Sequence, residues 1–139
     1  MTGYKAYQGN QVEGAGPLGL VLLSYEALAK SLAHAHRAIE AGDLAAEADH
    51  TSRAMESLIE LSSALNMDEG GKLSESLASL YGYMMNRLTG GLCSCSTEAV
   101  DEVAGLVRVL REGWEDLSAE IASRHSSQAA APQYAQMGR

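Results

Sequence analysis

The sequence predicts an all-α fold, an antiparallel four-helix bundle, from three observations. Hydrophobic residues make up 46% of the 139 residues and include no Phe; most are Ala and Leu, which are strong helix formers. The chain contains 2 prolines, Pro17 and Pro132, so no proline interrupts the long segment between them. Along this segment apolar residues recur at steps of three and four, the spacing of one helix face. The length suits a single domain.

The first helix is expected to begin at Pro17, because a proline at the first helical position gives up no hydrogen bond. It is expected to end at about Ala41, before Gly42. Its main apolar stripe consists of Leu18, Leu22, Tyr25, Ala29, Leu32, His36 and Ile39. Further apolar residues lie outside this stripe in the first two turns, namely Leu20, Val21 and Leu23. A bundle helix buries only about a third to a half of its surface. This surplus therefore predicts extra burial at the bundle end, cover by the residues before Pro17, or a groove for a partner helix.

The second and third helices are bounded by capping residues and glycines. The second is expected over residues 44–65, with Asp43 as its N-cap. Residues 66–71, which end in two glycines, form the next corner. The third helix is expected from about Gly71 to Thr89, and Gly90-Gly91 would end it as a left-handed C-terminal cap.

The fourth helix has the clearest pattern and is expected to start after Thr97, a good N-cap, and to end near Arg124. Its apolar stripe consists of Val100, Val103, Val107, Leu110, Trp114, Leu117 and Ile121. Short connections make consecutive helices antiparallel neighbours, so residues 17–124 are predicted to form the bundle domain. The Gly-rich residues 1–16 are expected to be a mobile N-terminal arm, and residues 125–139, rich in Ser, Gln and Ala, a disordered C-terminal tail.

The charge balance excludes several classes of partner. The chain has 18 Asp and Glu against 10 Lys and Arg, a net charge of −8. Nucleic acids and anionic membranes bind basic surfaces, so neither is expected as the partner. No apolar run approaches the roughly 18 residues of a membrane-spanning helix, and the polar N-terminus does not have the pattern of a signal peptide. Because Cys93 and Cys95 lie one residue apart, they cannot staple the fold, and a cytoplasmic, reducing location is predicted.

The sequence contains no group of residues that predicts catalysis. A dimetal site in a bundle needs two Glu-x-x-His pairs, and the chain has one, Glu47 with His50. Cys93-Ser94-Cys95 brings two thiols, whereas a tetrahedral metal site needs four ligands. Gly70-Gly71 lacks the Lys and Ser/Thr of a phosphate-binding loop. We therefore predict no enzyme activity, cofactor or metal site, and nucleophilic chemistry by Cys with a His base stays open.

Five segments, taken in order, resemble the FliS family of flagellin-specific export chaperones. They are the arm with Tyr and Gln (4–8), the apolar start of the first helix (17–28), and three later segments (38–43, 61–71 and 77–88). The last helix also fits, with Val103, Leu110, Arg111 and Trp114. The resemblance covers about residues 4–120, and its most distinctive segment is 77–88. Gly19, Ser24 and Gly82 depart from the usual family pattern.

The resemblance implies a cytosolic binding protein rather than an enzyme. Such chaperones hold the disordered C-terminal segment of flagellin in apolar grooves of the bundle, which prevents its premature polymerisation and keeps it competent for type III export. The arm is thought to cover one groove in the free protein. The partner-binding residues that the resemblance implies are Tyr7, Gln8, Leu18, Leu20, Val21, Leu22, Tyr25, Leu80, Tyr83 and Arg87.

Two alternatives stay open at this point. Apolar residues at helical spacing also suit a core, so Leu22, Tyr25 and Leu80 could have a purely structural role. The protein could also be a generic interaction bundle, such as a homodimer that pairs through its first helix, without binding flagellin. Other flagellar export or regulatory proteins are further partners that the family analogy suggests.

Overall fold

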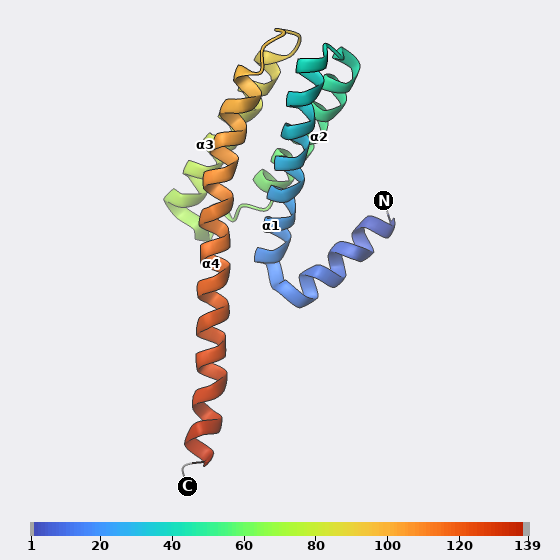
Figure 1. Ribbon diagram of the computed structural model, residues 1–139. Coiled ribbons are helices and arrows are strands. Elements are labelled where there is room, and N and C mark those ends of the chain that lie inside the picture. The colour runs from blue at the N-terminus through green and yellow to red at the C-terminus, as the bar shows by residue number, and fades with distance from the viewer. Residues whose placement is uncertain (1, 138–139) are drawn as a thin grey trace.

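The computed structural model is a bundle of four helices (Figure 1). The helices are α1 (Thr2–Ala41), α2 (Leu44–Ser63), α3 (Met67–Gly91) and α4 (Glu98–Met137). The structure describes the backbone of residues 2–137 and the side chains of residues 17–127. Helix α1 packs against α2 and α4, and α3 packs against the same two helices. The predicted all-α fold, an antiparallel four-helix bundle, is confirmed.

The two outer helices are longer than the sequence pattern suggests. Helix α1 begins at Thr2 rather than at Pro17, which lies inside the helix. Figure 1 shows a sharp bend in the N-terminal part of α1, as expected because a proline inside a helix removes a hydrogen bond and clashes with the preceding turn. Helix α4 continues past Arg124 to Met137 and extends beyond the other helices. The predicted mobile arm (1–16) and disordered tail (125–139) fall largely outside the residues whose side chains are described, and both stay predictions.

Side-chain caps explain where α2 and α3 begin. The carboxylate of Asp43 accepts a hydrogen bond from the backbone N–H of Ala46 at 3.0 Å, so the predicted N-cap of α2 is confirmed. Asn66 caps α3 in the same way through the N–H of Glu69, also at 3.0 Å. Helix α3 therefore starts before the predicted Gly71. That glycine lies in a non-helical conformation (φ 55°, ψ −132°) and separates a first turn from the rest of α3.

The connection between α3 and α4 contradicts one sequence prediction. Gly90 and Gly91 do not form a left-handed cap, because both lie within α3. The residues with positive φ are Cys93 and Cys95, at 61° and 62°. Gly91 has a steric role instead, since a Cβ atom there would lie 2.6 Å from the Cβ of Ala99 on α4. The glycine thus permits the close approach of α3 and α4 at this corner.

The core fills the bundle from its middle to the α3–α4 loop. Its buried members come from the apolar faces of all four helices: Tyr25, Leu28, Leu32, Ala35, Ala54, Leu58, Leu61, Leu77, Tyr81, Met84, Leu88, Val100, Val103 and Val107. The two tyrosine hydroxyls, on α1 and α3, lie 2.5 Å apart and hydrogen-bond across the bundle. Burial raises the pKa of both Tyr25 and Tyr81, so both phenols stay protonated and one donates to the other. The ring of Trp114 on α4 lies 6.5 Å from that of Tyr25.

Polar side chains connect α4 to its neighbours at the bundle surface. Nδ1 of His36 on α1 lies 2.7 Å from the carboxylate of Asp101, and its Nε2 lies 3.2 Å from Glu40 one turn along α1. The hydrogen bond to Asp101 is the main reason that the pKa of His36 is raised. This histidine therefore ties α1 to α4 more strongly when it is protonated.

The buried tyrosine pair predicts a non-additive effect on stability. Tyr25→Phe or Tyr81→Phe alone leaves one buried hydroxyl without its partner and should lower the free energy of unfolding by about 1–2 kcal/mol. The double variant removes both hydroxyls and should cost much less than the sum of the two single changes. Urea denaturation of the four proteins measures this, and additive losses would contradict a direct hydrogen bond.

The contacts of His36 predict a pH-dependent stability. Because its pKa is raised in the folded protein, the stabilisation is fully present below the unfolded value of about 6.5 and is lost as the pH rises through the folded pKa. The melting temperature of His36→Gln should therefore fall further below that of the wild type under mildly acidic conditions than under mildly alkaline ones. An equal difference under both conditions would show that protonation of His36 does not contribute.

Candidate functional site

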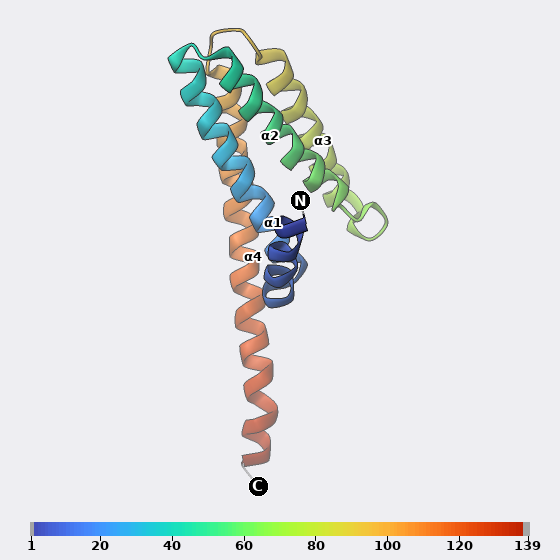
Figure 2. The same cartoon turned by 90° about the vertical axis from the view of Figure 1, so that its right-hand side faces the viewer.

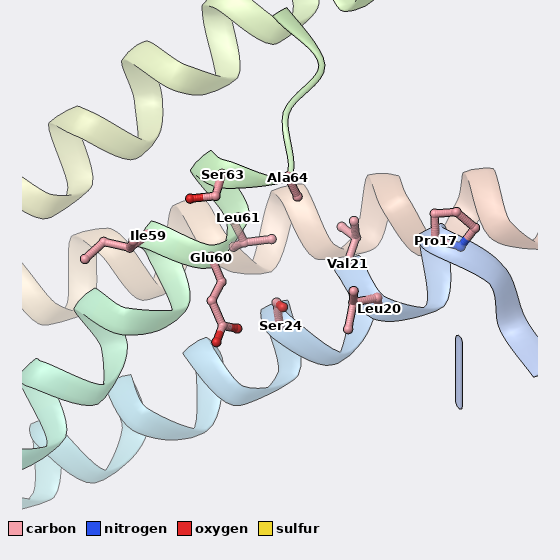
Figure 3. Close-up of a pocket in the computed structure, with 9 residues that line it drawn as sticks. All are labelled: Pro17, Leu20, Val21, Ser24, Ile59, Glu60, Leu61, Ser63 and Ala64. Carbon is pink, nitrogen blue, oxygen red and sulfur yellow. The ribbon is translucent and has the colours of Figure 1, made fainter. Parts of the chain in front are cut away.

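An apolar groove opens where the start of α1 passes the end of α2 (Figure 3). Its larger cavity, about 480 Å³, is lined by Pro17, Leu20, Val21, Ser24, Ile59, Glu60, Leu61, Ser63 and Ala64. A second cavity of about 170 Å³ is lined by Val21, Leu61, Ala64, Leu65, Asn66, Leu73, Ser74, Leu77, Tyr81 and Trp114. The two cavities share Val21, Leu61 and Ala64, so we treat them as one surface, the α1–α2 groove.

The groove exists because the helices diverge at this end of the bundle. Figure 2 shows the corner between α2 and α3 displaced away from α4, whereas the helices come together near the α3–α4 loop. The apolar side chains that face inward at the open end therefore do not fill the space between the helices. Tyr81 and Trp114, at the edge of the packed core, form part of the floor.

The rim of the groove carries large apolar side chains that are in contact with water. Ile59 is 53% exposed and Leu73 is 64% exposed. A partner with an apolar face would remove this surface from water, which is favourable by about 25 cal/mol for each Å² of apolar area. Exposed apolar side chains around a concave apolar surface are typical of a protein-binding site.

A further cavity, of about 240 Å³, lies on the other side of α1, toward α4. It is lined by Gly19, Leu22, Leu23, Glu26, Arg111 and Glu115. None of residues 18–23 is fully buried, so the apolar surplus in the first turns of α1 is not consumed by the core. The two faces of this short segment border two separate cavities.

The structure places the suggested site residues of α1 in different surroundings. Leu20 and Val21 line the groove, Leu22 lines the cavity toward α4, and Leu18 is half-buried nearby. Tyr25 is 0% exposed and belongs to the core, so it has no surface to offer a partner in this conformation. The side chains of Tyr7 and Gln8 lie outside the described residues.

The three suggested residues of α3 lie on another surface. Leu80 is half-buried against the core and borders a shallow depression with Glu75, Ser76 and Ser79. Tyr83 and Arg87 both hydrogen-bond to the carboxylate of Glu102 on α4, Arg87 at 2.7 Å. These three suggested residues are therefore not part of the α1–α2 groove.

The contacts of Glu102 give Tyr83 and Arg87 a structural role. Their hydrogen bonds, that of Tyr83 above all, lower the pKa of the Glu102 carboxyl group. The same bond raises the pKa of the Tyr83 phenol, which stays protonated and donates to the carboxylate. The triad thus connects α3 to α4 on the outside of the bundle.

Sequence reasoning did not single out the residues that α2, α3 and α4 contribute to the groove. They include Ile59, Ala64, Leu65, Leu73, Leu77 and Trp114. One available signal was Ile59, an apolar residue outside the core-facing stripe of its helix. The others lie in the apolar stripes or at a corner, where a groove residue has the same spacing as a core residue.

The side chains that suggested metal or thiol chemistry have other contacts. Glu47 is 3% exposed, and its carboxylate accepts a hydrogen bond from the backbone N–H of Cys93 at 3.3 Å. The ring of His50 stacks on that of His34 with centroids 4.9 Å apart. Among the side chains that the structure describes, no three of His, Cys, Asp or Glu are grouped as metal ligands. Nor is any described helix long and apolar enough to cross a membrane.

Comparison with known proteins gives one consistent result. Residues 1–121 match the family model of the flagellar protein FliS. The flagellar secretion chaperone FliS of Bacillus subtilis is 33% identical over 125 residues, which cover 89% of this chain and 92% of the relative. The chaperone of the same name from Salmonella typhimurium is 28% identical over 130 residues, 90% of this chain and 96% of the relative. The flagellar secretion chaperone FliSB of Pseudomonas aeruginosa is 32% identical over 108 residues, 78% and 86% of the two chains.

Proposed function

This chain belongs to the FliS family of flagellar proteins, and we propose on that premise that it binds the C-terminal segment of flagellin in the α1–α2 groove. Its relatives are flagellar secretion chaperones, and the chain is accordingly a chaperone of flagellar export rather than an enzyme. The client, the binding mode and the cytoplasmic location are the proposed part.

The observation that carries the proposal is the apolar groove between α1 and α2. Its lining is apolar apart from Ser24, Glu60, Ser63, Asn66, Ser74 and the hydroxyl of Tyr81. An amphipathic helix binds such a groove through apolar residues at steps of three and four. A segment that is disordered when free loses conformational entropy on binding, so it needs a long apolar surface to compensate. The cavity on the α4 side of α1 supplies a second contact for a client that wraps around the helix.

Binding of this kind explains how a chaperone without catalytic residues acts. While the apolar residues of the flagellin segment are covered, they cannot pair with those of another subunit. The client stays monomeric in the cytoplasm and competent for type III export. Release then needs only a competing interaction of similar free energy, since no covalent bond forms.

We also propose that residues 1–16 form an arm that covers the groove until the client arrives. Pro17, the first residue after this segment, lines the larger cavity, so the arm joins the bundle at the edge of the groove. A proline at this position interrupts the helical hydrogen bonding and makes the junction a suitable hinge. An intramolecular cover of this kind protects exposed apolar residues from non-specific association.

Replacing Leu20 by Glu should weaken the binding of the flagellin segment by about tenfold or more, because the bound helix would desolvate the new carboxylate. Isothermal titration calorimetry with the C-terminal segment of the organism's own flagellin measures the dissociation constant. Leu44→Glu is the matched control, since Leu44 is 54% exposed at the opposite end of α2. The affinity of Leu44→Glu for the flagellin segment should stay within about twofold of that of the wild type.

Circular dichroism shows whether each variant is still helical. A wild-type protein that is fully helical and binds no flagellin segment would contradict the proposed function. Equal losses for the two leucine variants would place the binding surface elsewhere. If the protein instead forms a homodimer through α1, its mass in solution will be twice that of the chain, and Leu20→Glu will reduce it to a monomer.

Removal of residues 1–12 tests the arm. On this proposal the arm covers the groove rather than filling the core, so the melting temperature should hardly change. The binding of an apolar fluorescent dye should increase as the groove is uncovered. Leu20→Glu in the shortened chain should suppress the added dye binding. Loss of the folded bundle on removal of the arm would contradict this model.

A further inference from the structure

A single carboxylate interrupts the larger cavity of the α1–α2 groove. Of the nine residues that line this cavity, Glu60 alone is charged. It lies between Ile59 and Leu61, which line the same cavity. Figure 3 shows its side chain extending from α2 toward α1, on the side of the cavity where Ser24 lies. An occupant of the cavity must therefore pass close to this carboxylate.

Glu60 has no cationic partner among the side chains that the structure describes. The ion pairs of the bundle are formed by other acids, among them Glu102 with Arg87 and Glu115 with Arg111. Glu60 is exposed, so water now solvates its charge. Because the neighbouring lining is apolar, a partner that binds in the cavity would displace this water from the carboxylate.

The cost of covering an unpaired carboxylate determines which helices can bind. A purely apolar helix seated in the cavity would remove water from Glu60 and supply nothing in its place. A Lys or Arg beside the apolar stripe of the helix would restore the lost interaction through a charge-assisted hydrogen bond. The apolar stem of a Lys or Arg could also lie along Ile59 while its charged end reaches the carboxylate. The net charge of −8 favours a basic segment over an acidic one at long range as well.

We propose that Glu60 is a specificity-determining residue, which pairs with a Lys or Arg that flanks the apolar stripe of the bound flagellin helix. This inference rests on the proposed function and adds the chemical character of the client. The apolar lining supplies affinity and is tolerant of sequence, whereas the carboxylate disfavours helices that present an apolar or acidic residue at that place. It also fixes the register of the helix in the groove.

The test compares Glu60→Lys and Glu60→Gln with the wild type in calorimetric titration against the flagellin segment. Glu60→Lys should weaken binding by about tenfold or more, and Glu60→Gln by about threefold. The wild-type affinity should fall as the ionic strength rises, more steeply than that of Glu60→Gln. Glu56→Lys is the matched control. Glu56 is exposed one turn earlier on α2 and lines neither cavity of the groove. The affinity of Glu56→Lys for the flagellin segment should therefore stay within about twofold of that of the wild type.

Charge reversal in the client identifies the partner of Glu60. Each Lys and Arg of the flagellin segment is replaced by Glu in turn and titrated against the wild type and Glu60→Lys. One reversal should weaken binding to the wild type and restore binding to Glu60→Lys. Tight wild-type binding that Glu60→Lys leaves unchanged, or a loss that no client reversal restores, would overturn the inference while the proposed function stands. A wild type that binds no flagellin segment would contradict the proposed function itself.

Discussion

The hydrogen bond between Tyr25 and Tyr81 lies where the packed core of the bundle meets the α1–α2 groove. It joins α1 to α3 across the bundle at 2.5 Å. The inward-facing residues of α1 that follow Tyr25 are buried, whereas residues 18–23, which precede it, are only half-buried. Beyond the tyrosine pair the helices diverge, and Tyr81 becomes part of the groove floor. One helix thus contributes to a packed core in its second half and to the lining of the groove at its start.

The amino-acid composition fits this division. The buried Leu, Ala, Val and Met residues of the core need only to fill the space between the helices. A buried tyrosine also needs a hydrogen-bond partner for its hydroxyl. The pairing of two tyrosines gives each hydroxyl a hydrogen-bond partner and favours this alignment of α1 and α3 over shifted ones. Toward the open end the same apolar residue types have no facing helix, and they line the groove. As the proposed partner surface, this groove needs no catalytic group, which agrees with membership of a chaperone family.

The sequence was sufficient for the fold and for part of the groove, and the failures have physical reasons. Apolar spacing predicted four helices, and the surplus at Leu20 and Val21 indicated the groove, because both signals are local. Gly90 and Gly91 were misinterpreted, since glycine usually ends a helix, whereas here Gly91 makes room for Ala99 of another helix. Ile59 and Trp114 were missed as groove residues, because their exposure depends on how far the helices diverge. The bonds of Tyr83 and Arg87 to Glu102 were not predicted, because no helical pattern reveals a contact between helices. The client contacts of these two residues stay a prediction.

On the proposed binding mode, a flagellin helix covers the start of α1 and the end of α2. Amide hydrogen exchange of the protein, free and in complex with the flagellin segment, tests it most directly. Exchange should slow on binding over residues 17–24 and 59–65, and should stay unchanged over residues 44–51 at the other end of α2. Slower exchange confined to the α3–α4 loop or to the outer face of α3, with residues 17–24 unaffected, would contradict it.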